Sequence, residues 1–322
     1  MSAVLALAGD TMLGRGVAAR LREDPRAPLV GPRLGALLAA ADAVVLNLEC
    51  CVSARGERWP APGKVFFFRA PPLAAARLAD LGVRAVMLAN NHALDYGHAA
   101  LVDTVEHLTA AGITAVGAGA DLAAARRPAM LDIAHEPLAL IGLTDHPADF
   151  AATTATPGVA FADLGPGLPA WVRAAVHEAG QRAPVLVSPH WGPNMASAPV
   201  REVSRAADQL MDAGPALVAG HSAHVFQGVA GRVLFDLGDF IDDYAPHPTL
   251  RNDLGALWLA HLDAGAFTGV QVVPLRLREA LTEVAQGEDA AWVRRRLRAA
   301  CARLGTDVHV SGDELLIRLD GR

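Results

Sequence analysis

The stretch AVMLANNHALDYG (85–97) guides the interpretation of the whole chain. It opens with a fully apolar run, AVMLA, which is typical of a strand buried in a parallel sheet. Two asparagines, a histidine and an aspartate follow, and the next residues have the pattern of a helix. Open α/β sheets bind ligands at this place, the carboxyl end of a buried strand. The alternative is that Asn90 and Asn91 cap the helix and that His92 lies in a solvated turn.

The same arrangement recurs along the chain. Apolar runs end in potential ligands at six places, namely Asp10, Glu49, Asn91 with His92, His190, His221 with His224, and Asp239. Because strand ends meet at one edge of an α/β sheet, these side chains are expected to lie together. Histidines mixed with carboxylates and an amide are the ligand chemistry of a divalent metal such as Zn, Mn, Fe or Co. Any one of them alone would be read as a turn former.

Composition narrows the class of protein. The 322 residues suffice for one large domain, and alternating strand and helix patterns predict a layered α/β architecture. A net charge of −6 argues against nucleic acid as a partner, and the one dense basic run, RRRLR (294–298), is interpreted as the solvated face of a terminal helix. The apolar runs are too short for a signal peptide or a membrane span, and three cysteines cannot form a disulfide framework. We therefore expect a cytoplasmic protein with no membrane partner.

Two further residues are candidates for substrate binding. Arg15 follows the apolar run that carries Asp10, and its guanidinium suits a peptide carboxylate or a phosphate; the alternative is that it holds a surface carboxylate. Trp191 is next to His190 and offers an aromatic wall, with plain packing as the alternative. Cys50 and Cys51 lie beside Glu49, where small apolar side chains explain them better than metal ligation.

Together these residues resemble the CapA-like proteins of poly-γ-glutamate capsule synthesis, a branch of the calcineurin-like metallophosphoesterases. The matching pieces occur in the family's order: GDTMLGR (9–15), NLE (47–49), NNHALDYG (90–97), HWG (190–192), GHSAHVFQG (220–228) and LGDF (237–240). The resemblance implies a four-layer α/β/β/α sandwich over residues 1–275, with a C-terminal helix and hairpin, residues 276–322, packed on the same domain. It also implies a centre of two divalent ions, among which Mn, Zn, Fe, Co and Ca are not distinguished.

Residue roles follow from the resemblance. Asp10 and His224 would hold the first ion, Glu49 would bridge both ions, and Asn91, His190 and His221 would serve the second. His92 would be an acid or base beside the ions. Two positions depart from the pattern: Met12 replaces a histidine of the wider superfamily, and Asp239 stands where the capsule proteins usually have asparagine.

The resemblance also includes cytosolic relatives that epimerise the C-terminal residue of lasso peptides, a class of ribosomal peptides. We therefore expect a metal-dependent peptide epimerase with His92 and Asp239 as its acid/base pair. The alternatives are a metallohydrolase of phosphoester or γ-glutamyl bonds, acting on a small anionic substrate, and a binding protein without turnover.

Overall fold

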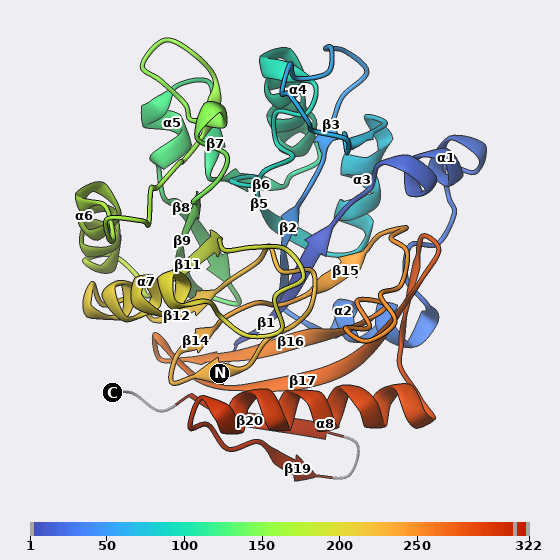
Figure 1. Cartoon of the computed structure of the whole chain (residues 1–322), viewed down its shortest axis with the longest axis vertical. Helices are drawn as coiled ribbons and strands as arrows, with labels where there is room; N and C mark the ends of the chain where they lie inside the picture. Colours follow the sequence, from blue (N-terminus) through green and yellow to red (C-terminus); the bar gives the residue numbers. More distant parts are fainter. Residues whose placement is uncertain (1–2, 312–313, 320–322) are drawn as a thin grey trace.

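Two sheets form the centre of the computed structural model, which describes residues 3–311 and 314–319 (Figure 1). The larger has ten strands; its main path runs β19 (His309–Ser311), β20 (Glu314–Arg318), β17 (Ala266–Arg278), β16 (Leu254–Asp263), β1 (Ala3–Thr11), β2 (Ala43–Leu48), β5 (Val83–Met87) and β6 (Thr114–Val116), with β15 (Asp239–Ile241) beside β1 and β18 (Leu281–Val284) beside β17. The smaller has six, in the order β13 (Val229–Ala230), β14 (Val233–Leu234), β12 (Leu217–Ala219), β11 (Val185–His190), β9 (Glu136–Thr144) and β8 (Ala129–Ile133). Two short pairs join β3 (Cys51–Val52) to β4 (Arg69–Ala70) and β7 (Ala118–Gly119) to β10 (Gly158–Val159).

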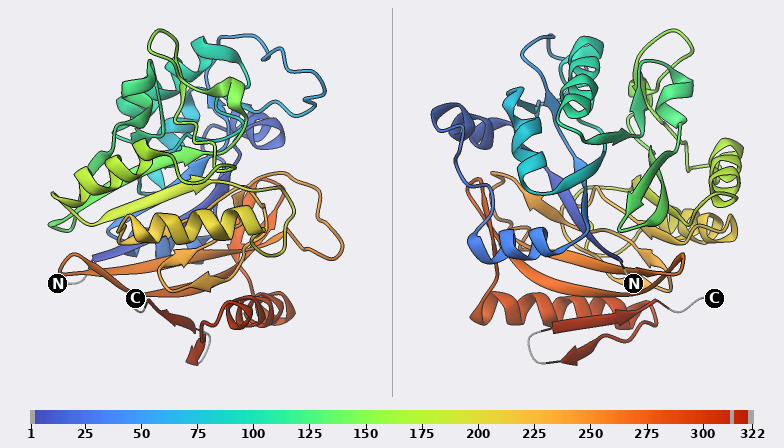
Figure 2. Two further views of the ribbon diagram at one scale, coloured as in Figure 1. Left: turned by 60° about the vertical axis from the view of Figure 1, so that its left-hand side comes forward. Right: turned by 180° about the vertical axis from the view of Figure 1, so that it is seen from behind.

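Helices cover the faces of the two sheets (Figures 1 and 2). They are α1 (Arg15–Glu23), α2 (Pro32–Ala40), α3 (Leu73–Asp80), α4 (Gly97–Ala110), α5 (Leu122–Arg126), α6 (Ala170–Gly180), α7 (Arg201–Asp212), α8 (Gly287–Arg303) and a 3-10 turn, η1 (Ala148–Phe150). No helix in the described residues is both long and apolar enough to span a membrane. The α/β class expected from the sequence is confirmed.

Alternation along the strands explains the layers. Successive residues of a strand face opposite sides of the sheet, so a strand that is apolar throughout packs against a core on each side. In β1, Ala6 and Ala8 face the core under helices α1–α4, whereas Leu5 and Leu7 face the core shared with the smaller sheet. The far side of the smaller sheet packs on α6 and α7 through a third core.

The C-terminal residues continue the larger sheet. The expected boundary after residue 275 falls inside β17, and β20 pairs with that strand. Helix α8 lies along the long strands β16 and β17 and contributes Val293 and Leu297 to the core between the sheets (Figure 2).

Candidate metal centre

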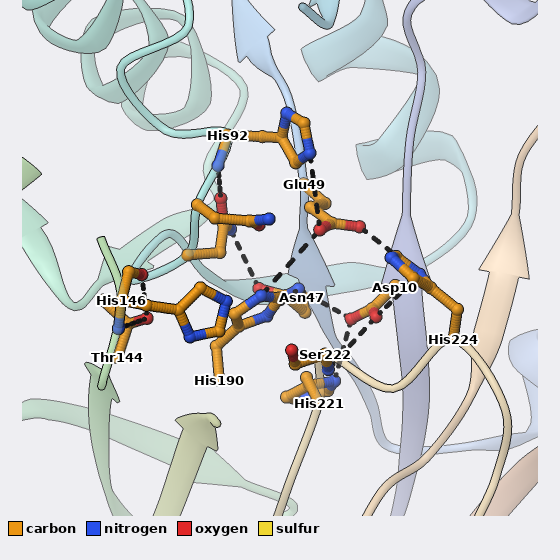
Figure 3. Close-up of polar contacts among 12 residues, drawn as sticks. Asp10, Asn47, Glu49, His92, Thr144, His146, His190, His221, Ser222 and His224 are labelled. Carbon is orange, nitrogen blue, oxygen red and sulfur yellow. Dashed lines mark hydrogen bonds and ion pairs between the residues drawn. The ribbon is translucent and has the colours of Figure 1, made fainter. Parts of the chain in front are cut away.

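Strand register brings the expected ligands together. Asp10 lies beside Asp239 where β1 pairs with β15, and His190, at the end of β11, bridges to His221. Glu49 is the first residue after β2. The carboxyl ends of parallel strands from both sheets therefore converge on one place (Figure 3).

Close backbone approaches make this convergence possible. A Cβ atom on Gly9 would lie 1.7 Å from the carbonyl oxygen of Gly238, so only glycine lets β1 and β15 meet beside Asp10. In the loop GHSAH, Ser222 and His224 have φ values of 111° and 58°. Such left-handed residues are uncommon outside glycine and cluster at functional sites, and here they turn both histidines of the loop toward the centre.

The distances between ligand atoms fit shared metal ions. Histidine nitrogens and carboxylate oxygens bound to one ion at about 2.0–2.2 Å lie roughly 3 to 4 Å apart. The Nδ1 atoms of His221 and His224 are each 3.4 Å from an oxygen of Asp10. His190 Nε2 and His224 Nδ1 are each 3.9 Å from an oxygen of Glu49. These separations are longer than a hydrogen bond and suit two groups that hold the same ion.

Unpartnered buried atoms support this interpretation. Buried polar atoms normally have hydrogen-bond partners. Among the described residues, several atoms of the expected ligand set lack one: both carboxylate oxygens of Glu49, Asn91 Oδ1, His190 Nε2, His221 Nδ1 and Asp239 Oδ2. Two groups have donor atoms close enough to share an ion, Asp10 with Glu49 and His190, and Asp10 with His224 and Asp239. The donor set therefore fits a divalent metal.

Neighbouring side chains orient the ligands. Ser188 Oγ is 2.9 Å from His221 Nε2, which leaves the other ring nitrogen facing Asp10. Asn47 donates to Asp10 over 2.7 Å and contacts His190 Nδ1 at 3.3 Å. Metal-binding histidines commonly hold their second nitrogen in this way. The sequence argument assigned no role to Ser188 or Asn47, although Asn47 stands inside the NLE motif.

His92 lies beside the ligands in a fixed orientation. Its Nδ1 is 2.7 Å from Asp95 Oδ2, and its Nε2 points to Glu49 at 3.9 Å. The ring stacks on Phe68 with centroids 4.2 Å apart, and Lys64 pairs with Asp95 at 2.9 Å. The imidazole is thus held by a carboxylate on one side and presented to the centre on the other.

The two positions that depart from the family pattern lie in different surroundings. Met12 is fully buried in the core under the helices, and its sulfur accepts a hydrogen bond from the Gly14 N–H. Asp239 Oδ1 is 2.9 Å from His224 Nδ1, within the second ligand group. The Asp239 carboxylate therefore lies among donor atoms that could share an ion, and its expected role as an acid or base stays a prediction.

The expected substrate contacts are placed differently. Trp191 is only 2% exposed, packs in the core under α6 and α7, and donates its indole N–H to Phe235. This corrects the expectation of an aromatic wall, because the ring is covered by core residues. Arg15 is 41% exposed and pairs with Asp243 at 3.4 Å, as in the alternative interpretation.

A second histidine–aspartate pair escaped the sequence argument. His146, two residues after β9, has its ring centroid 5.3 Å from that of His190, and its Nδ1 contacts Asp145. At 34% side-chain exposure it is more accessible than His92, at 8%. The run LIGLTDHP (140–147) has the strand-then-polar pattern of the other ligands, and that signal could have found it. Figure 3 shows the His146 ring pointing toward His190 and the centre.

Burial and mutual charge shift the titration of the centre. Burial raises the pKa of Glu49 and Asp239 well above the usual carboxyl range. Burial opposes the charged form of His224, but Glu49 and Asp10 outweigh it and raise its pKa. Burial would also raise the pKa of Asp10, but His221 and the other histidines hold it below its usual range. Glu49 and Asp239 thus lack enough neighbouring positive charge to stay ionised, as expected where cations belong.

These shifts predict how pH affects the protein freed of metal by EDTA. Above about pH 6.5, where unfolded carboxyl and histidine side chains have released their protons, the raised pKa values of Glu49, Asp239 and His224 let the fold retain protons, so stability should fall as pH rises through those raised values. Burial lowers the pKa of His190, so the titration of this residue affects stability only at lower pH. Chemical denaturation at several pH values measures the trend. Saturating metal should abolish or reverse it, because ligands bind deprotonated; a metal-free protein that gains stability toward pH 9 contradicts the expectation.

With this geometry established, similarity to known proteins identifies the family. Residues 4–244 match the family model described as bacterial capsule synthesis protein PGA_cap. The chain is a member of this PGA_cap family. The CapA-like resemblance drawn from the sequence motifs is thereby confirmed.

Curated relatives of the family agree over most of the chain. A "probable polyglutamine synthesis accessory protein" of Mycobacterium tuberculosis is 34% identical over 86% of this chain and 77% of its own length. The "PGA biosynthesis protein CapA" of Bacillus subtilis is 29% identical over 84% of this chain and 71% of its own length. A crystal structure of a hypothetical protein from Thermus thermophilus covers 85% of this chain and 99% of its own, with 14% identity and a TM-score of 0.45.

Proposed function

We propose that this protein is a metal-dependent peptide epimerase, which removes and returns the proton at a Cα atom, as at the C-terminal residue of a ribosomal precursor peptide. The observation that carries the proposal is the presence of two histidine–aspartate pairs at one candidate metal centre. His92 with Asp95 follows a strand of the larger sheet, and His146 with Asp145 follows a strand of the smaller sheet.

Inversion at carbon needs two proton carriers, because the proton leaves one face and returns to the other. A divalent ion held by the ligand set would act as a Lewis acid on a substrate carboxylate or carbonyl and so acidify the neighbouring C–H bond. One histidine removes the proton, and the electron pair of the broken C–H bond stays on carbon. The other histidine donates a proton to the opposite face of that carbon. Asp95 and Asp145 orient the two rings and stabilise the imidazolium that forms.

Hydrolysis of a γ-glutamyl or phosphoester bond is the second candidate. The names of the relatives, which refer to polyglutamine and PGA synthesis, favour an amide of glutamate as its substrate. This reaction needs one general acid, and His92, with its Nε2 3.9 Å from Glu49, would supply it.

Incubation in D₂O separates the candidates. Peptides of varied C-terminal residue, short γ-glutamyl oligomers and a simple phosphoester are each added with Mn, Zn, Fe(II), Co or Ca, and mass, chirality and free phosphate are followed. Epimerisation adds one mass unit at Cα and produces the D-residue without cleavage. Shortened chains or released phosphate without inversion overturn the epimerase and support the hydrolase. If no substrate is epimerised or cleaved, the interpretation that remains is a binding protein without turnover.

His146→Gln tests the two-carrier arrangement. If each histidine serves one face, this variant should lose inversion by about 10²-fold or more but still exchange the Cα proton of one substrate isomer. His92→Gln should retain exchange with the opposite isomer. Exchange and inversion are measured separately, with His177→Gln on the exposed face of α6 as a matched control. Loss of exchange with the same isomer in both variants contradicts the assignment.

A further inference from the structure

Helix α8 presents an arginine-lined face that the metal centre does not use. Its inward face buries Ala290, Val293, Leu297 and Cys301. Beside that face lies a stripe of residues on neighbouring turns of the helix. It consists of Trp292, Arg295, Arg296, Ala299 and Arg303. The RRRLR run was interpreted as a solvated face, but the guanidinium of Arg296 is turned inward.

This stripe forms one wall of a pocket. The pocket has a volume of about 380 Å³, and its lining consists of Ser197, Trp292, Arg295, Arg296, Ala299 and Arg303. Ligand pockets for small molecules usually measure about 300–1,000 Å³. No acidic residue lines it, in a chain whose net charge is −6. The pocket lining is therefore positively charged, although the chain as a whole is negatively charged.

Arg296 is held in position without a counter-charge. Its guanidinium carbon lies 5.3 Å from the ring centroids of both Phe226 and Trp292, and these two rings meet edge to face. Its Nη2 is buried and has no hydrogen-bond partner among the described residues. Burial lowers the pKa of Arg296, and the charge of Arg303 lowers it further.

The Asp289 carboxylate, on the same helix, is already paired with other arginines. Asp289 on the same helix pairs with Arg251 at 3.0 Å and also contacts Arg276. In the part of the chain that the structure describes, Arg295, Arg296 and Arg303 have no carboxylate within ion-pair distance. A buried cation with an unused donor costs free energy unless an anion completes it.

We propose that this pocket binds a multiply charged oxyanion, a ligand bearing phosphate or carboxylate groups. Guanidinium donors match the oxygens of either group in pairs, and two aromatic rings hold the half-buried Arg296 guanidinium in place before the ligand arrives. Three arginines call for a ligand with at least two negative charges. The site shares no residue with the metal centre, although Phe226 is only two residues from His224.

Calorimetric titration of the full chain, freed of metal with EDTA and then dialysed into buffer without EDTA, tests the proposal, since bound metal ions would take up the same anions. Pyrophosphate is the phosphate probe and tri-γ-glutamate the carboxylate probe, at constant ionic strength. At least one should bind, and Arg296→Met should weaken its binding by about 10- to 100-fold. The probe that binds more tightly identifies the source of the oxyanion.

Two further variants keep the test decisive. Arg303→Met removes an exposed lining residue, so it should weaken binding even if Arg296→Met disturbs the packing against Phe226. Arg298→Met removes the same charge from an exposed position of α8 outside the pocket and should change the dissociation constant less than about twofold. Binding of neither probe, or equal weakening by Arg298→Met and Arg303→Met, overturns the proposal.

Discussion

Replacing His92 by alanine should leave the bound metal in place and reduce turnover by about 10²–10⁴-fold, the usual contribution of a positioned acid or base. The ring contacts the ligand set only through Nε2, 3.9 Å from Glu49, while its Nδ1 is engaged by Asp95. Removing it therefore deletes a proton carrier and keeps the donors that hold the ions. Metal content by mass spectrometry and the rate of the reaction found in D₂O are measured on the same sample.

Two controls accompany this variant. His92→Gln keeps more of the contact with Phe68, whose ring stacks on the imidazole, and so separates loss of packing from loss of chemistry. His177→Ala removes an exposed histidine of α6 and should leave the rate unchanged. If His92→Ala loses its metal, His92 is a ligand and its assignment as acid or base is wrong.

Glu49→Gln should weaken metal binding by more than about 100-fold, since changes to groups outside the ligand set already cost 10- to 100-fold. Glu49 is fully buried, and its oxygens lie 3.9 Å from His92, His190 and His224. Among the described residues, no other carboxylate lies within 4 Å of histidine nitrogens from both sheets. Competition with a chelating indicator gives the affinity.

The same substitution should have the opposite effect on the metal-free protein. Burial raises the pKa of Glu49, so its ionised form is unfavourable in the fold, and an uncharged amide should raise the free energy of unfolding in EDTA by roughly 1 kcal/mol or more. Glu178→Gln, at an exposed position of α6, should change neither quantity. Lower stability of Glu49→Gln in both states would mean that Glu49 serves the fold rather than a cation.

Local sequence patterns predicted much of this molecule because buried strands and the residues after them are visible without tertiary contacts. AVMLA, VLALA and AVVLNL are apolar throughout, and the polar residues that follow could only lie at the carboxyl ends of strands. Asp10, Glu49, His190, His221 and His224 were predicted on this ground and do converge. Their convergence follows from parallel pairing, which the alternation of strands and helices implies.

Other features depend on which side chains meet across the two sheets. Trp191 follows a ligand in sequence, yet its side chain packs in the core between the smaller sheet and its helices. Met12 packs in the core between the larger sheet and its helices. Asp239 acts beside His224 because β15 pairs with β1, and His146 reaches the centre because β9 pairs with β11. Strand register and loop geometry determine which of these side chains are neighbours, and a short sequence segment predicts neither of them.

The sequence by itself determined the α/β class, the family and the chemical type of the centre, because buried strands and strand-end ligands are properties of short segments. Only the tertiary structure decided which nitrogen of each histidine faces the centre, which aspartates orient His92 and His146, and that Arg296 lies half-buried against Phe226 and Trp292 without an acid. Those features arise where segments far apart in the chain pack together, and the free energy of such packing belongs to the assembled fold.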